Sequence, residues 1–282
     1  MKCAWQSLIH ILPPWMRADV DRQGREALQE LRIRRNRVPQ LILNTGIKEL
    51  SRTATDSDIA FILNAASAYS PWASDTMAQG FLTAEGGHRI GIGGLTVVKS
   101  GQMAGFRNPN SLCIRVARDF PGIAASLSML SGSVIILGPP GSGKTTLLRD
   151  LIRQWSATQK KIITVVDERG ELFPCNGMEN CFDPGPNTDV LTGCSKSQGI
   201  EAALRNMGPA VIAVDEITAE DDCRALQHAG WCGVDLIATA HAGSIKDLYS
   251  RPVYNTLANS HLFSTAVIMR SDKTWTTERM NL

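Results

Sequence analysis

Apolar and polar residues follow different patterns in the two halves of the chain. From residue 134 onward, short runs of mostly β-branched apolar residues alternate with stretches spaced like amphipathic helices. The predicted strands are Val134–Leu137, Ile162–Val166, Val211–Val214, Leu236–Ala240 and Ala266–Met269. The predicted helices are Lys144–Trp155, Gly199–Met207 and Asp221–Ala229. Short apolar strands separated by helices are typical of a parallel sheet covered on both faces, so this half predicts an α/β domain.

The first half has a mixed pattern. LQELRIRRNRVPQLIL predicts the end of a helix followed by a strand with an arginine cluster, and DSDIAFILNAASAYS predicts a helix. FLTAEGGHRIGIGGLTVVKSGQMAG has the alternation and glycine punctuation of a β-meander. We therefore expect an α+β domain over residues 1–120 and the α/β domain over 121–282, opening with a helix start at Pro121–Leu130. The loop Phe173–Ser195 is long for a compact domain, which is typical of functional or mobile loops.

Length and composition agree with two folded domains. The chain has 282 residues, 43% of them hydrophobic and 20% charged, which excludes wholesale disorder. Its 29 basic and 27 acidic residues leave a net charge of +2, which excludes a strongly cationic coat protein for nucleic acid. No apolar run approaches the roughly 18 residues of a membrane-spanning helix, and the start of the chain does not resemble a signal peptide. We expect a cytoplasmic protein.

The cysteines agree with that location. There are seven, an odd number, and no pair has C-x-x-C spacing. Reduced thiols are the favoured interpretation, and no zinc site is predicted. A metal clip formed by three cysteines of one polar stretch is the alternative: Cys175, Cys181 and Cys194.

The clearest chemical signal is a phosphate-binding loop. GPPGSGKT matches G-x-x-x-x-G-K-[ST] at every fixed position, between a predicted strand and a predicted helix. Backbone N–H groups would surround a phosphate, Lys144 would reach the β- and γ-phosphates of ATP, and Thr145 would bind Mg²⁺. The alternative is a glycine turn that only caps a helix. The expected nucleotide-binding residues are Gly138, Pro139, Pro140, Gly141, Ser142, Gly143, Lys144, Thr145 and Thr146.

Acidic residues follow two predicted strands. Asp215 and Glu216 end VIAVDE, where Asp215 would bind Mg²⁺ through water and Glu216 would polarise the attacking water. Asp167, Glu168 and Glu171 follow a second strand and could add carboxylates near the metal or γ-phosphate. Solvated charges at ordinary strand exits are the alternative for both groups.

The motifs in this order resemble the stage III sporulation AA family, relatives of the hexameric ATPases of type II and type IV secretion and pilus assembly. The resemblance rests on GPPGSGKTT, TVVDERGEL, VIAVDEI and IATAHA, with LQELRIRRNR and GFLTAEGGHRIGIGG in the first half. It covers roughly Leu28 to Met269 and implies a RecA-like motor domain behind a smaller N-terminal α+β domain. It also implies an ATPase that works as a hexamer in the mother cell and couples to a membrane channel to the forespore.

The resemblance assigns further residues. Asp167, Glu168 and Glu171 resemble the aspartate box, whose carboxylates assist hydrolysis, and Thr239 and His241 resemble the histidine box that senses nucleotide. A structural histidine at a strand end is the alternative for His241. Two departures are a longer Ala229–Val234 stretch and the lack of a tetracysteine zinc module.

A ring ATPase also needs an arginine finger, and Arg115, which precedes the domain junction, is the expected one. Arg118 also precedes the junction, and surface charge is the alternative for every candidate, Arg115 included. The remaining candidates are Arg89, Arg107, Arg205, Arg251 and Arg270.

The sequence therefore predicts a Mg²⁺-dependent ATPase that forms homo-hexamers and reaches the membrane only through sporulation channel proteins. The arginine patch at positions 32, 34, 35 and 37 is a solvated strand edge, a subunit contact or a docking site for an acidic membrane partner. It lacks the interleaved aromatic residues of a base-stacking surface, so no nucleic acid is expected. The alternatives are a nucleic-acid-dependent ATPase and a scaffold that binds ATP with little turnover.

Overall fold

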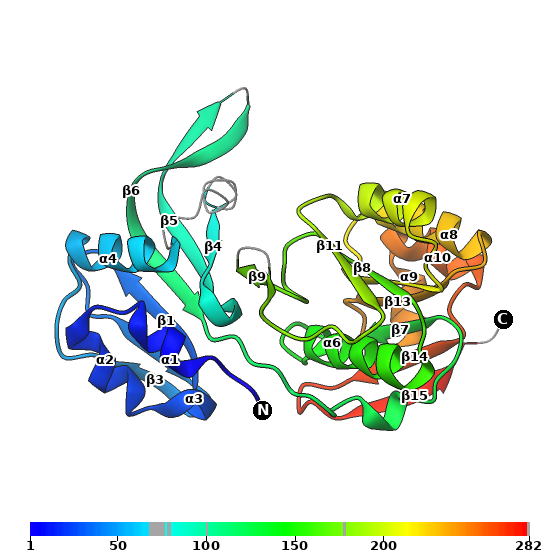
Figure 1. The fold of residues 1–282 in the computed structure, drawn as a ribbon, viewed down its shortest axis with the longest axis horizontal. Coiled ribbons are helices and arrows are strands. Elements are labelled where there is room, and N and C mark those ends of the chain that lie inside the picture. The colour runs from blue at the N-terminus through cyan, green and yellow to red at the C-terminus, as the bar shows by residue number, and fades with distance from the viewer. Residues whose placement is uncertain (68–76, 78–79, 100, 177–178, 281–282) are drawn as a thin grey trace. The chain divides into compact units, whose positions relative to one another are not determined.

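Two compact units make up the chain. The computed structural model describes residues 1–67, 77, 80–99, 101–176 and 179–280 (Figure 1). Unit 1 contains Met1–Asp119 and Pro174–Phe182, and unit 2 contains Phe120–Phe173 and Asp183–Leu282. The sequence pattern placed all of 121–282 in one domain, whereas Pro174–Phe182 packs with the N-terminal residues. A sequence pattern could not reveal this, because the segment leaves the α/β unit and returns to it within nine residues.

In its described residues, unit 1 is built on a six-stranded antiparallel sheet of order β3-β2-β1-β6-β5-β4. The strands are β1 Leu28–Arg34, β2 Gln40–Leu43, β3 Gly46–Glu49, β4 Phe81–Thr83, β5 Arg89–Lys99 and β6 Gln102–Arg115. The helices are α1 Trp5–His10, α2 Pro14–Asp21, α3 Gly24–Ala27 and α4 Asp56–Ser67, with a 3₁₀ turn at Glu85–Gly87. The predicted meander is present as β4, β5 and β6. The helix predicted over 56–70 is present to Ser67, and its last three residues lie outside the described part.

Alternation along β1 explains why the stretch after residue 28 is a strand rather than the end of a helix. Leu31 and Ile33 are buried in the core of unit 1, whereas Arg32 and Arg34, between and after them, are exposed on the other face of the sheet. Period-two alternation with one buried face is the pattern of a strand that covers a core. The preceding helix is only the four-residue α3.

Pro174–Phe182 forms a small hairpin within unit 1, made of β9 Cys175–Asn176 and β10 Glu179–Asn180. It packs tightly against Gly87, which has a φ of +83°. A Cβ added to Gly87 would lie 2.8 Å from Cγ of Pro174 and 3.4 Å from Cβ of Cys181. Glycine is therefore required there both by its backbone conformation and by the close approach of the hairpin.

Unit 2 contains a seven-stranded sheet, as far as the structure describes it, of order β11-β8-β12-β13-β7-β14-β15. All neighbours are parallel except β15, which runs antiparallel to β14. The strands are β7 Val134–Leu137, β8 Ile163–Asp167, β11 Thr188–Thr192, β12 Val211–Glu216, β13 Asp235–Ala240, β14 Thr265–Met269 and β15 Trp275–Arg279. The helices are α6 Lys144–Gln154, α7 Lys196–Asn206, α8 Glu220–Trp231, α9 Ile245–Ser250 and α10 Asn255–Ser260.

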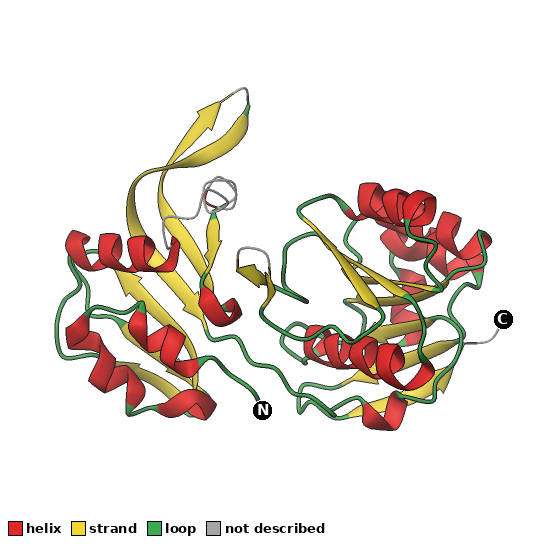
Figure 2. Ribbon diagram, viewed as in Figure 1, coloured by secondary structure: helices red, strands yellow, loops and turns green. Residues whose placement is uncertain are grey.

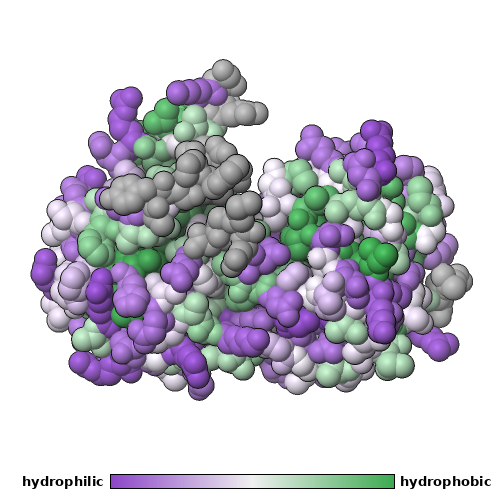
Figure 3. Space-filling view, viewed as in Figure 1, coloured by the Kyte–Doolittle hydropathy of each residue, from purple (hydrophilic) through white to green (hydrophobic). Residues whose placement is uncertain are grey.

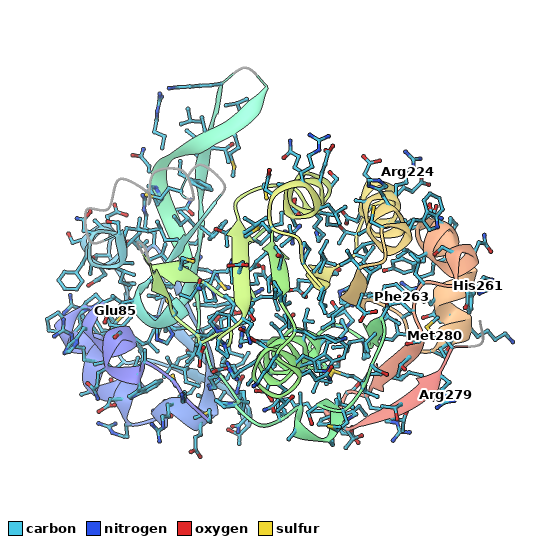
Figure 4. All side chains as sticks on the ribbon, turned by 45° about the vertical axis from the view of Figure 1, so that its right-hand side comes forward. Glu85, Arg224, His261, Phe263, Arg279 and Met280 are labelled. Carbon is cyan, nitrogen blue, oxygen red and sulfur yellow. The ribbon has the colours of Figure 1, made fainter. Side chains whose placement is uncertain are left out.

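Helices cover both faces of this sheet (Figure 2). Helix α6 packs on one face against β7, β12 and β13, and α7 and α8 pack on the other. The outer surface over α7 is hydrophilic (Figure 3). Phe263 and Met280 are buried in the core at the β14–β15 side, whereas Arg224 and Arg279 are exposed (Figure 4). The predicted parallel sheet covered on both faces is thus present.

Several elements of unit 2 differ from the predictions, and helices α9 and α10 were not predicted at all. Strand β11 lies inside the segment expected to be a loop, and β15 was not predicted at all. Both are edge strands rich in polar residues, with only partly buried or exposed positions, so neither has a core-strand pattern. The helix expected at Pro121–Leu130 is instead a series of turns with a 3₁₀ helix at Ala125–Leu127. In the described residues, no helix is long and apolar enough to cross a membrane.

Candidate functional site

The phosphate-binding loop follows strand β7 and leads into α6. All four residues of β7 are buried, and the loop ends at Gly143, whose φ of +97° lies in the left-handed region. At the start of the loop, a Cβ on Gly138 would lie 2.8 Å from Oγ of Ser142 and 2.9 Å from the Met269 carbonyl oxygen. Both glycines are therefore required by the path of the chain, which turns the loop back over the N-terminus of α6.

Lys144 is held inside this loop. Its ammonium group donates to the carbonyl oxygens of Gly138 at 2.9 Å and Pro139 at 3.0 Å. Burial lowers the pKa of Lys144, and the carboxylates of Glu216 and Asp215 partly oppose this effect. A phosphate group bound here would favour the charged ammonium in the same way.

Ser142 contributes a buried hydroxyl without a partner. Ser142 is 1% exposed, and its Oγ has no hydrogen-bond partner among the residues that the structure describes. Buried hydroxyls without a partner are rare in folded proteins and indicate an atom that a ligand satisfies. Together with the ammonium of Lys144 and the N-terminus of α6, this hydroxyl suits a phosphate anion.

Asp215 ends β12 and meets two hydroxyl groups. Oγ1 of Thr145 lies 3.3 Å from both of its carboxylate oxygens, and Oγ1 of Thr239 lies 3.3 Å from one of them. Burial raises the pKa of Asp215 to about 6, aided by the carboxylates of Asp167 and Glu171 and opposed by the hydrogen bonds from both threonines. A divalent cation would reverse this effect, because it stabilises the charged carboxylate.

These oxygen atoms fit Mg²⁺ shared with a nucleotide. In the described part of the chain, no group of three or more His, Cys, Asp or Glu side chains could hold a metal alone. Mg²⁺ commonly uses one or two carboxylates, water and the phosphates of its substrate, so the pair Thr145 and Asp215 suits that mode. Of the three cysteines considered for a metal clip, Cys175 and Cys181 belong to unit 1 and Cys194 belongs to unit 2.

His241 joins the phosphate-binding loop to Glu216. Its Nδ1 lies 3.0 Å from Nζ of Lys144, and its Nε2 lies 2.8 Å from Oε1 of Glu216. Because a lysine ammonium can only donate, Nδ1 accepts this bond and the ring proton is on Nε2, from which it is donated to Glu216. The ends of β7, β12 and β13 thus bring Lys144, Glu216 and His241 into one chain of contacts at the carboxyl edge of the sheet.

The carboxylates after β8 separate into two groups. Asp167 is 1% exposed and accepts from the backbone N–H groups of Glu171, Leu172 and Phe173. Burial raises its pKa, against the effect of these three bonds. Arg149 of α6 donates to the carbonyl oxygens of Glu171 and Leu172, so the turn is fixed from both sides.

Glu168 was predicted to lie with Glu171 near the metal or γ-phosphate, but its carboxylate binds a lysine instead. Its Oε2 accepts a bond of 2.6 Å from Lys196, the first residue of α7. Asp167 and Glu171, by contrast, are the carboxylates that raise the pKa of Asp215. Asp167 is the last residue of β8, whereas Glu168 lies in the turn that follows it. No role was predicted for Lys196 from the sequence, because the predicted helix begins at Gly199, three residues after it.

The arginine-finger candidates are in varied settings. In unit 1, Arg115 has a side chain that is 66% exposed and lies 3.6 Å from Glu30. Arg118 donates to the carbonyl oxygens of Arg25 and Leu28, so it ties α3 to the end of the sheet. In unit 2, Arg205 forms an ion pair with Glu201 of its own helix, and Arg251, which follows α9, forms one with Asp247 of that helix.

Comparison with solved structures shows the fold. The pilus retraction motor PilT with bound ADP superposes with a TM-score of 0.59 at 16% identity, covering 91% of this chain and 78% of that one. The Legionella pneumophila ATPase DotB gives a TM-score of 0.57 at 15% identity, covering 93% and 78%. The predicted RecA-like P-loop ATPase fold with an N-terminal α+β unit is therefore confirmed.

Sequence comparison shows the family. Stage III sporulation protein AA of Bacillus subtilis (strain 168) is 36% identical over 271 residues, which are 91% of this chain and 88% of that protein. The family model described as sporulation stage III, protein AA, matches residues 7–279. Both findings confirm the resemblance inferred from the motifs. The chain belongs to the sporulation stage III protein AA family.

Proposed function

We propose that the protein is a Mg²⁺-dependent ATPase of the secretion-motor type. The observation that carries the proposal is the junction of three strand ends, where Lys144 and Glu216 both contact His241 and Thr145 contacts Asp215. A scaffold that only binds nucleotide would need the phosphate-binding loop but not a carboxylate oriented by a histidine beside it. The family and the fold of secretion ATPases support the same activity.

Each residue has a proposed part. The loop from Gly138 to Thr146, with Lys144 and the buried hydroxyl of Ser142, would bind the phosphates of ATP. Thr145 and Asp215 would hold Mg²⁺, which neutralises phosphate charge when it is bound. Glu216 would accept a hydrogen bond from the attacking water and orient it, as a general base does, while His241 keeps the carboxylate in place.

Two further residues complete the proposal. Glu171 adds negative charge close to Asp215 and would help to hold the water or metal. Arg115 would act in a neighbouring subunit as the finger that stabilises transition-state charge, which requires a ring such as a hexamer. The B. subtilis relative is named for sporulation stage III, which supports a role in the mother cell with membrane-embedded channel proteins as partners.

The test is ATP hydrolysis by wild-type protein and by Glu216→Gln, together with the mass in solution with and without ATP. We expect turnover in the wild type, a loss of about 100-fold or more in the variant with ATP binding retained, and ATP-favoured hexamers. Each assay is repeated with single-stranded DNA. Stimulation by DNA would support a nucleic-acid-dependent ATPase instead, and tight ATP binding without turnover in the wild type would support a scaffold.

A further inference from the structure

Lys196 is a buried cation in an unfavourable place. It is 6% exposed and is the first residue of α7, where the helix dipole is positive. A buried ammonium at a helix N-terminus is costly unless carboxylates compensate it. Two do so here: Oε2 of Glu168 at 2.6 Å and Oδ2 of Asp222 at 3.7 Å.

The two carboxylates belong to the two acidic strand ends of the site. Glu168 follows β8, next to the buried Asp167. Asp222 lies in the first turn of α8, which follows β12 with its Asp215 and Glu216. Oδ2 of Asp222 also accepts from the backbone N–H groups of Thr218 and Ala219, so it is fixed in the turn that leaves β12. Lys196 therefore bridges the segments that carry the site's carboxylates.

The packing of α7 maintains this bridge. Gly199, one turn after Lys196, approaches β8 so closely that a Cβ would lie 2.3 Å from Cγ1 of Val166 and 3.0 Å from Sγ of Cys194. The close approach brings the N-terminus of α7 to the end of β8, within reach of Glu168. The ion pair and the glycine contact are independent observations of the same docking.

We infer that Lys196 is a positioning residue of the proposed ATPase site, which holds the acidic end of β8 in register with the acidic end of β12 through Glu168 and Asp222. This inference rests on the proposed function. Without the ammonium, Glu168 loses its fixed partner, and repulsion among the neighbouring carboxylates moves the turn that carries Asp167 and Glu171. The phosphate-binding loop, which Lys196 does not contact, keeps its affinity for nucleotide.

The experiment measures kcat and KM for ATP in wild-type protein and five variants, with thermal unfolding as a check on folding. We expect Lys196→Met to lower kcat by about 10-fold or more with little change in KM. Such a loss is typical of residues that orient the side chains of a site without contacting the substrate. Lys196→Arg recovers most of the rate, because it restores the charge. In the background of Glu168→Gln, Lys196→Met causes a smaller loss than it does alone, because only its contact with Asp222 is left to remove.

The matched control is Lys161→Met. Lys161 binds Asp235 at 2.8 Å, but this pair lies at the amino ends of the strands, away from the site. Lys161 precedes β8, and Asp235 is the first residue of β13. Its removal leaves kcat unchanged. The double variant Lys196→Met with Glu168→Gln leaves no unpaired Glu168 carboxylate, so it remains informative if Lys196→Met alone folds poorly.

The outcomes separate the two proposals. Wild-type protein without turnover overturns the ATPase proposal and this role together. If the wild type turns over ATP and Lys196→Met leaves kcat unchanged, only the role of Lys196 is overturned. The same holds if Lys196→Met lowers kcat equally in the wild-type and Glu168→Gln backgrounds. A loss of rate that Lys161→Met reproduces also overturns it, because the effect would then be one of general stability.

Discussion

Asp215 makes the metal-free protein less stable as the pH rises, and its replacement should reveal this. In the folded protein the pKa of Asp215 is raised to about 6, from a reference value of 3.8. A carboxyl group whose pKa is raised by folding contributes stability that is fully present below the unfolded pKa. That stability is lost as the pH rises through the folded pKa.

The size of the effect follows from these two pKa values. The difference between about 6 and 3.8 is about 2 pKa units, and at about 1.4 kcal/mol per unit it corresponds to about 3 kcal/mol. The contribution of Asp215 to the free energy of unfolding should therefore fall by up to about 3 kcal/mol between pH 4 and pH 6.5 and then stay level. Asp215→Asn cannot ionise and removes this loss, while it keeps an oxygen that can accept from Thr145 and Thr239.

The assay is urea unfolding of both proteins in EDTA without nucleotide, at pH 5 and pH 7.5. Asp215→Asn should be the more stable protein at pH 7.5, and its advantage should shrink at pH 5. Adding Mg²⁺ and ATP should reverse the order, because only the wild-type carboxylate gains from the cation. The exposed Asp189→Asn, on β11, controls for the loss of one charge. Equal stability at pH 7.5, or an advantage that does not change with pH, would refute the reasoning.

Two further substitutions test the packing around the site. Asp150 of α6 is 1% exposed and accepts from the N–H groups of Gly122 and Ala124 and from Arg153, so Asp150→Ala should cost about 3–5 kcal/mol in urea unfolding; a loss below 1 kcal/mol would contradict a buried, fully engaged carboxylate. Gly199→Ala should cost about 1–3 kcal/mol, because its methyl group would overlap Val166, and an unchanged melting temperature would show that α7 can move away freely.

Much of unit 2 could be predicted from the sequence because its central strands are buried on both faces. Strand β7 has its predicted bounds, and β8, β12, β13 and β14 lie within two residues of theirs. Edge strands β11 and β15 lack that signal, since one side of each faces no neighbouring strand and their residues are largely polar. The turns at Pro121–Leu130 depend on contacts with Asp150, which lies 26 and 28 residues away along the chain.

The residues of the site also fall into those that a local sequence pattern predicts and those that it does not. The residues of the phosphate-binding loop and the pair Asp215 and Glu216 were predicted because a strand, a turn and a helix define them locally. The contact of His241 with both Lys144 and Glu216, and the divergence of Glu168 toward Lys196, depend on how separate strands and helices dock. No spacing along the chain encodes such contacts, so only the structure could reveal them.

The hairpin at Pro174–Phe182 has a consequence for how this protein can be divided or recombined. The polypeptide passes from one unit to the other at three places, after residues 119, 173 and 182. A fragment that ends at Asp119 would lack the side chains that pack on Gly87 and leave an apolar surface uncovered. A chimaera that joins the N-terminal unit of one family member to the ATPase unit of another would bring a foreign hairpin to that glycine. Exchanges within the family should therefore succeed only when the nine-residue hairpin travels with the N-terminal unit.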